Sequence, residues 1–293
     1  MRRNFPIRES RIALSACLLA ASLLGVCAAQ ELTVPASVTA GEETVISTTG
    51  SGTATFYLLG PGVSRKNEVS LGQEIHLQAR DLQTAGDYLA ILCSGTCRSA
   101  SFYVNAAKPA SVTFLVHPSR VPVGQSDAVS GVAFPFDQFH NLVLTQKAIN
   151  FQLTAGSSSL LSQSVRTRDG VAWFRTASGK AAGTLQVVAS LDDLSAKRAV
   201  QQVASDPCNL HIQGQRTANG ILVETEPVHD CAGNPVPDGT IVTFTATEAG
   251  GKDTVDAPIK KGIAKAQMDA AGAVVVSAAS GVVMGNEVRI GAH

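Results

Sequence analysis

The sequence predicts an all-β fold of tandem β-sandwiches, and three observations support this prediction. Short runs that alternate apolar and polar residues recur along the chain, and no segment beyond the first thirty residues keeps helical periodicity for long. Gly, Pro, Asn and Asp punctuate these runs every eight to twelve residues, a spacing typical of sandwiches. Part of the pattern also repeats after about 90–93 residues, which is the size of one small sandwich.

The predicted strands share an alternation of β-branched or aromatic residues with polar ones, which suits a half-buried pleated surface. They cover residues 53–59, 74–79, 87–92, 101–106, 111–117, 148–154, 171–176, 184–190, 240–247, 273–280 and 286–292.

The first 29 residues are predicted to be a secretory signal. Four arginines precede an apolar run of 14 residues at 12–25, which is too short to span a bilayer comfortably. Small residues follow, and they predict cleavage after Ala28 or Ala29. The arginine pair at the start resembles a twin-arginine signal only faintly. No second apolar run of membrane length follows, so we expect an exported protein without a transmembrane segment in the mature chain.

Lipidation is an alternative fate for the exported chain. Cys27 could carry a lipid anchor, although Val26 before it matches the usual motif poorly. Cys17 matches better but lies too early, with most of the apolar run after it. We therefore favour a protein that is periplasmic, surface-bound or extracellular without a lipid.

The charge balance argues against nucleic acid as the partner. Lys and Arg number 23, and so do Asp and Glu. Removing residues 1–29 takes away four arginines and one glutamate, which leaves 19 basic and 22 acidic residues and a net charge of −3. Such a chain has no basic surplus to neutralise phosphates.

Four cysteines remain after the signal, and an even number in an exported chain predicts disulfides. Three pairings are possible. Sequence position favours Cys93–Cys97 and Cys208–Cys231, because the two pairs fall in different predicted domains. We expect the second bridge to stabilise its domain by about 3–4 kcal/mol on the chain-entropy model. The first closes a very short loop and would pin a strand end or a hairpin tip.

The internal repeat defines the domains. When Asp137 is aligned with Asp230, Asn141 falls on Asn234 and later apolar positions also coincide. Polar, proline-bearing joints at 105–111 and 203–208 separate the strand runs. The resulting domains are 31–106, 107–204 and 205–293, each predicted to be an immunoglobulin-like β-sandwich.

The last domain resembles the bacterial immunoglobulin-like domain of the invasin and intimin type, group 1. The matching positions are Asp230, Gly233, Asn234, Pro235, Val236, Gly239, Val242 and Phe244. The middle domain keeps Asp137, Asn141, Val143 and Phe151, but has His140 in place of Gly and Leu142 in place of Pro. The first domain lacks the motif; its Gly86 and Tyr88 resemble a tyrosine corner, although Cys93 follows the tyrosine by five residues rather than two.

This resemblance implies an extracytoplasmic adhesion, interaction or spacer module, without catalytic residues or cofactors. Its partner would be a protein or a surface glycan. A structural subunit of a secreted or envelope assembly is the alternative, and an exported enzyme is third. No catalytic motif of the common hydrolases occurs in the mature chain, which disfavours the enzyme.

A zinc site, a redox-active cysteine pair and a calcium site each compete with a simpler structural interpretation. Zinc could use Cys208, His211, His229 and Cys231, but export favours oxidation of the two thiols. Redox activity of Cys93 and Cys97 would need a different spacing and a helix N-terminus. Calcium could bind the acidic pair at 192–193 or the one at 253 and 256, although a solvated turn is the simpler interpretation. We therefore expect no metal.

The candidate contact surface is aromatic. Trp173 is the only tryptophan, and in its strand pattern either Trp173 or Phe174 must face outward. The segment at 134–140 is the most aromatic in the chain and contributes Phe134, Phe136 and Phe139. If exposed, these four aromatic residues (Phe134, Phe136, Phe139 and Trp173) would form a patch for a sugar or a protein. The competing interpretation places them in the core or in the repeated turn.

Overall fold

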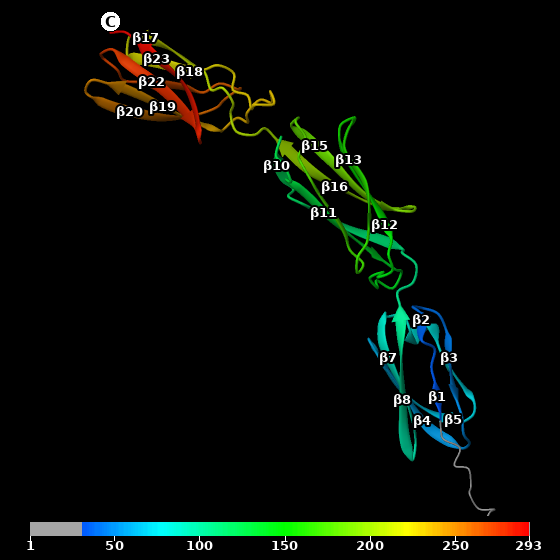
Figure 1. The fold of residues 1–293 in the computed structure, drawn as a ribbon. Coiled ribbons are helices and arrows are strands. Elements are labelled where there is room, and N and C mark those ends of the chain that lie inside the picture. Colours follow the sequence, from blue (N-terminus) through cyan, green and yellow to red (C-terminus); the bar gives the residue numbers. More distant parts are fainter. Residues whose placement is uncertain (1–30, 293) are drawn as a thin grey trace, which may run out of the picture. The chain divides into compact units, whose positions relative to one another are not determined.

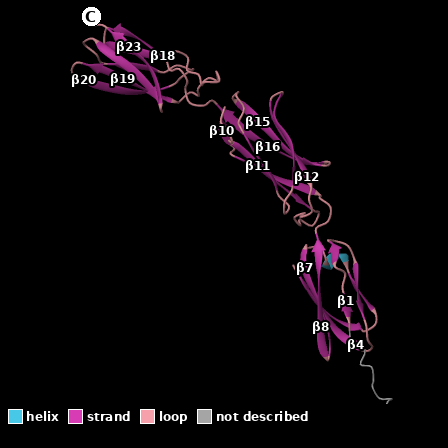
Figure 2. Cartoon of the chain, viewed as in Figure 1, coloured by secondary structure: helices cyan, strands magenta, loops and turns pink. Residues whose placement is uncertain are grey.

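A computed structural model describes residues 31–292 of the chain. The predicted signal, with Ala28, Ala29 and Cys27, lies outside the described residues. The chain divides into two compact units, Met1–Val104 and Asn105–His293. Strands and loops make up the described part apart from one short 3-10 helix, η1 (Ala79–Asp81), as Figure 2 shows. Within these residues no helix is both long and apolar enough to cross a membrane.

The first unit contains one pair of sheets (Figure 1), with strand orders β1-β3-β6 and β2-β8-β7-β4-β5. The strands are β1 (Leu32–Thr33), β2 (Ser37–Thr39), β3 (Thr44–Thr48), β4 (Thr53–Gly60), β5 (Val63–Ser70), β6 (Glu74–Leu77), β7 (Gly86–Ser94) and β8 (Thr96–Asn105). Tyr88 is buried, and its hydroxyl donates a hydrogen bond to the carbonyl of Thr84 at 2.9 Å. That bond to the backbone upstream has the form of a tyrosine corner, as the sequence suggested.

The second unit begins with a five-stranded sheet of order β10-β16-β15-β12-β13 and a three-stranded sheet of order β14-β11-β9, which we call the second sandwich. The strands are β9 (Ser111–His117), β10 (Arg120–Pro122), β11 (Val129–Phe136), β12 (Ala148–Ala155), β13 (Ser158–Arg166), β14 (Ala172–Thr176), β15 (Gly183–Leu191) and β16 (Leu194–Val203). Phe114, Phe151 and Phe174 meet in its core, with the rings of Phe151 and Phe174 4.9 Å apart. Gly131 gives these rings room, because a Cβ there would overlap Phe174.

The remaining strands form a third sandwich with its own core around Phe244. Its sheets have the orders β17-β18-β21 and β20-β19-β22-β23, and Figure 1 shows the four strands of the latter side by side. The strands are β17 (Ile212–Thr217), β18 (Gly220–Thr225), β19 (Ile241–Glu248), β20 (Gly251–Pro258), β21 (Lys265–Met268), β22 (Val274–Ser280) and β23 (Val283–Ile290).

The structure confirms the predicted all-β fold, and every strand expected from alternation overlaps an observed one. Alternation did not predict β1, β2, β3, β5, β10, β11, β13, β16, β17, β18, β20 and β21. Among these strands, β5, β13 and β20 lie at the edge of their sheets. Their side chains are mostly exposed on both faces, so the sequence shows no apolar alternation there. The domain boundaries at 106–107 and 204–205 stay predictions, since the division by contacts leaves residues 105–293 in one unit.

Candidate functional site

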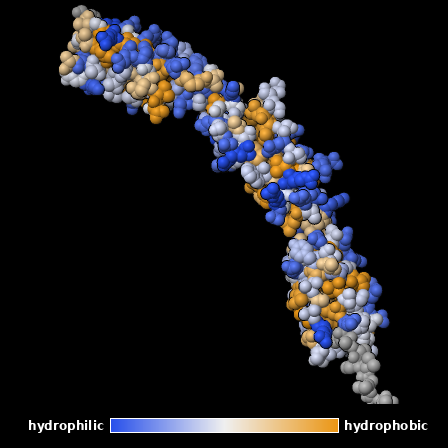
Figure 3. Space-filling model, viewed as in Figure 1, coloured by the Kyte–Doolittle hydropathy of each residue, from blue (hydrophilic) through white to orange (hydrophobic). Residues whose placement is uncertain are grey.

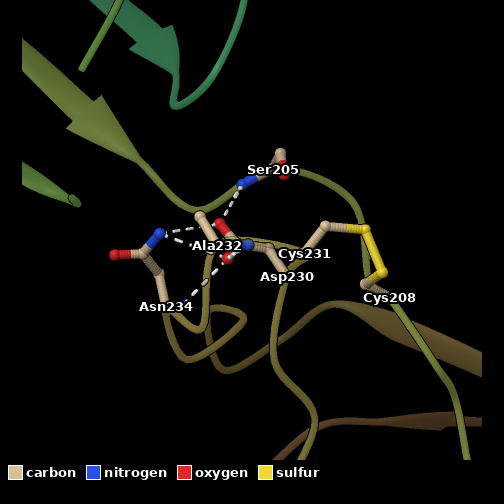
Figure 4. Close-up of a disulfide and its surroundings, with 6 residues drawn as sticks. All are labelled: Ser205, Cys208, Asp230, Cys231, Ala232 and Asn234. Atoms are coloured by element: carbon tan, nitrogen blue, oxygen red, sulfur yellow. Dashed lines mark hydrogen bonds between the residues drawn. A yellow bond between two sulfur atoms is a disulfide. The ribbon is translucent and has the colours of Figure 1, made fainter. Parts of the chain in front are cut away.

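The stretch around Asp230 forms a hydrogen-bonded turn tied by a disulfide (Figure 4). Oδ1 of Asp230 accepts bonds from the backbone N–H groups of Ala232 at 2.8 Å and Asn234 at 2.9 Å. Oδ2 accepts from the side-chain amide of Asn234 at 3.0 Å and from the backbone N–H of Ser205 at 3.1 Å. Ser205 lies in the segment that leads into β17, so the carboxylate holds this incoming segment against the turn.

The second sandwich repeats this arrangement at Asp137. Oδ1 accepts from the backbone N–H groups of Phe139 at 2.9 Å and Asn141 at 2.8 Å. Oδ2 accepts from the Asn141 amide at 2.8 Å and from the N–H of Ala107 at 2.9 Å, in the segment before β9. An equivalent aspartate therefore accepts equivalent hydrogen bonds from the turn and from the incoming segment in both sandwiches.

The two turns share a backbone conformation, although the residues at equivalent positions differ. Gly233 has a φ of 83° and His140, its counterpart, has a φ of 65°, so both adopt the left-handed conformation. That conformation suits glycine and strains a histidine. Val143 and Val236 are both buried and mark the return of the chain into the core.

Hydrogen bonding controls the ionisation of these aspartates. Burial opposes the charged form of Asp230, but the bonds donated by Asn234, Ser205 and Ala232 outweigh it and lower the pKa of the carboxyl below its ordinary value. The pKa of Asp137 is lowered for the same reasons, burial again being outweighed by donated bonds. Both groups are therefore carboxylates that serve as fixed acceptors at neutral pH.

Cys208 and Cys231 are joined in a disulfide with an S–S distance of 2.01 Å, which agrees with the expected pairing. Their sulfurs are therefore not available as zinc ligands. His229 is exposed, and its Nδ1 lies 3.0 Å from the carbonyl oxygen of Pro227. The described residues contain no group of three or more His, Cys, Asp or Glu side chains that could hold a metal ion. The acidic candidates for calcium lie on exposed turns and strands.

Cys93 and Cys97 form the other disulfide and face each other directly across β7 and β8. Gly95 makes the turn between the two strands with a φ of 75°. The bridge therefore clamps the tip of a hairpin, which is the structural role that the sequence suggested.

Trp173 dominates the outer face of the three-stranded sheet in the second sandwich. Its side chain is 65% exposed, whereas its neighbour Phe174 is only 2% exposed and enters the core. Trp173 pairs with Val132 on β11, and Val132 pairs with Leu115 on β9. These three side chains therefore form one apolar row across the sheet, with Leu115 55% exposed.

The predicted aromatic residues are only partly brought together. Phe134 and Phe136 are half-buried and share a face of β11 with Val132, because residues two apart on a strand point the same way. Phe139 lies instead in the Asp137 turn and is half-buried there. Figure 3 shows apolar residues next to strongly hydrophilic ones on the surface of this sandwich.

Sequence reasoning missed the polar residues around Trp173. Arg175 pairs with Ser130, and Ser130 pairs with His117, in a second row beside the apolar one. Arg166 and Arg168 line a further hollow that Trp173 also borders. The two-residue spacing from Trp173 to Arg175 was the one available signal, because nothing in the sequence reports the register between strands.

Comparisons with known proteins bear on the fold. No family model and no curated protein matches the sequence. Among solved structures, FdeC, an Escherichia coli adhesin, is similar with a TM-score of 0.63 and 16% identity, over 89% of this chain and 95% of that one. At this identity the likeness shows the fold alone.

Two further bacterial proteins are more distant. Invasin, an integrin-binding protein, has a TM-score of 0.49 and 10% identity over 90% of this chain and 59% of that one. InvD of Yersinia pseudotuberculosis has a TM-score of 0.49 and 11% identity over 89% and 96%.

Proposed function

We propose that the chain is an exported, non-enzymatic immunoglobulin-like module for adhesion or interaction, at the bacterial cell surface or in the periplasm. The main observation in support of this proposal is the apolar row of Trp173, Val132 and Leu115 on the outer face of a sheet. A solvent-facing tryptophan continuous with other apolar side chains is typical of a contact surface. The two disulfides and the fold of an adhesin support export.

The proposal includes the domain organisation expected from the sequence. Residues 1–29 are removed after Ala28 or Ala29, and the mature chain consists of domains 31–106, 107–204 and 205–293. We assign the last two to the invasin type on the shared turn. The support for this assignment is that Asp137 and Asp230 make equivalent hydrogen bonds.

A binding role fits the surface better than catalysis does. The hollows near Trp173 are open and are lined by apolar, arginine, amide and serine side chains and by one histidine. His117 lines one of them, but no Asp, Glu, Lys, Cys or Tyr lines any of the three, so the histidine has no second acid or base beside it there.

The alternative is a structural subunit of an envelope assembly, which would exchange a strand with a neighbouring subunit. The last described strand, β23, pairs with β22 inside its own sheet. That strand is therefore already used within the chain, and we favour the binding module.

The test measures attachment directly. Beads coated with the full chain, and beads coated with albumin, would be applied to cultured cells and to immobilised matrix glycans. We expect saturable attachment of the first set alone, with competition by free protein. A parallel fractionation with crosslinking of the native protein would locate it.

Equal attachment by both bead sets would refute the adhesion role. Recovery of the native protein in the cytoplasmic fraction would refute export, and with it the role of residues 1–29. Recovery of a stoichiometric crosslinked envelope complex, with no bead attachment, would favour the structural subunit.

A further inference from the structure

We infer that the outer face around Trp173 binds an acidic sugar, by stacking a pyranose ring on the indole and by holding its carboxylate with neighbouring arginines. This inference rests on the proposed function, since it names the ligand chemistry of the module's contact surface. The partners that the sequence allowed were a protein or a glycan; the geometry of this face favours the glycan.

The stacking platform is the indole of Trp173. Sugar rings present a face of C–H groups that packs on an aromatic ring, and an indole fixed on a strand offers this area with little loss of side-chain freedom. With 65% of its surface exposed, Trp173 contributes little to the core of its own domain. The ring therefore stays available to a ligand.

Hollows of suitable size adjoin the platform. One of about 410 Å³ lies on the outer face and is bordered by Trp173, Leu115, His117 and Ser130. Ser130 is one of its lining residues, and the Ser130 hydroxyl donates a hydrogen bond to the carbonyl of His117 at 3.3 Å. Two further hollows, of about 660 and 780 Å³, also border Trp173. These volumes are in the range of small-ligand sites, about 300–1,000 Å³.

The charge around the indole selects an acidic ligand. Arg175 lines one hollow that borders the indole, Arg166 and Arg168 line another, and no Asp or Glu lines any of the three hollows. None of these arginines forms an ion pair or a side-chain hydrogen bond with a described residue. A guanidinium group offers paired N–H donors that match a carboxylate, so each of these arginines can donate hydrogen bonds to the carboxylate of a bound sugar.

The surroundings disfavour an added peptide strand. Such a strand would need one of the two edges of this sheet. The edge strand β14 is only five residues long and is contacted by β13 of the facing sheet, and the other edge strand, β9, is contacted by β16 and β15 of that sheet. Gln163 lines the same hollow as Arg175, and Gln146 lines the same hollow as Arg166 and Arg168. Amides placed beside arginines suit the many hydroxyl groups of a sugar better than the backbone of a strand.

The test uses the single tryptophan of the chain as its own reporter. The emission of Trp173 would be followed while the full chain is titrated with trigalacturonate or with sialyllactose, which separates uronic from sialic acids. Their neutral partners, methyl-esterified trigalacturonate and lactose, serve as matched probes. We expect at least one acidic probe to shift the emission saturably, at a concentration about tenfold below that of its neutral partner.

Variants separate stacking from charge, with binding measured by saturation-transfer NMR on the sugar. We expect Trp173→Ala to weaken binding about tenfold and Trp173→Phe to retain part of it, since an aromatic contact contributes on that order. Arg175→Gln should weaken the acidic probe and leave the neutral one unchanged. Arg198→Gln, an exposed arginine on β16 of the same sandwich, is the control and should have no effect.

Several outcomes would overturn the inference. One is that neither acidic probe changes the emission of Trp173. Another is that acidic and neutral probes bind equally well. A third is that Arg175→Gln and Arg198→Gln weaken binding of the acidic probe equally. Binding of an oligoglutamate peptide instead, with the same dependence on Trp173, would assign the face to an acidic peptide and not to a sugar. If beads carrying Trp173→Ala still attach to cells, this site is wrong while the adhesion role stands.

Discussion

Replacing Asp230 by Asn tests whether the turn carboxylate holds the third sandwich together. The substitution keeps the size of the side chain and removes its charge. Asp230 is only 4% exposed and accepts bonds on both oxygens. An amide has one acceptor oxygen, so whichever way it turns, an NH₂ group faces backbone N–H donors that now lack an acceptor.

The cost follows from the contacts. In the better orientation the amide oxygen stays with Ala232 and Asn234, and the N–H of Ser205 loses its partner. A net hydrogen bond to a charged group contributes about 1.5–3 kcal/mol, and the remaining bonds weaken when their acceptor becomes neutral. We therefore expect Asp230→Asn to lower the free energy of unfolding of the third sandwich by about 2–4 kcal/mol at pH 7.

The pH dependence has a definite sign. The ordinary pKa of an aspartate, which applies to the unfolded chain, is about 3.9. The pKa of Asp230 is lowered in the folded chain. Its contribution is therefore complete above that ordinary value and is lost as pH falls below about 4, through the folded pKa. The native chain should lose stability over this acid range more steeply than Asp230→Asn does.

The assay must resolve one sandwich from the others, because a multidomain chain does not unfold in a single step. Hydrogen exchange of the amides in residues 212–290, at pH 7 and in the acid range, provides this resolution. The control is Asp253→Asn, an exposed carboxylate on β20 of the same sandwich. A loss within about 0.5 kcal/mol of that control, the usual range for surface changes, would refute the reasoning.

Four further variants test other elements, each by hydrogen exchange of the affected sandwich. Replacing Cys208 and Cys231 by Ser should cost about 3.5 kcal/mol, since the bridge joins residues 23 apart; no loss would show that the hydrogen bonds suffice. His140→Gly should stabilise, and Gly233→Ala destabilise, by about 1 kcal/mol each, because both positions are left-handed; changes of the opposite sign would exclude this explanation. Gly131→Ala should cost about 1–3 kcal/mol by overlap with core rings, and an unchanged stability would contradict the packing.

Much of the fold was accessible from the sequence because its signals are local. Alternation predicted seven inner strands of the larger sheets, β4, β7, β8, β12, β15, β19 and β22, since one face of each must be apolar to build a core. It missed the inner strands β3, β11, β16 and β18. The spacing of Asp137 to Asn141, repeated at Asp230 to Asn234, predicted a shared turn. Its residues contact one another over four positions, so the pattern survives in the printed sequence. The hairpin disulfide at Cys93 and Cys97 could be anticipated for the same reason.

Tertiary structure decided what depends on strand register and on exposure. The edge strands β5, β13 and β20 bury little, so no alternation marks them. The incoming segments at Ala107 and Ser205 reach their aspartates across 30 and 25 residues of sequence, which no local pattern reports. The sequence by itself determined that either Trp173 or Phe174 must face outward. Only the tertiary structure decided that Trp173 is the outward one. The register of the three strands places it in line with Val132 and beside a row that contains Arg175, because a sheet brings together residues far apart in the chain.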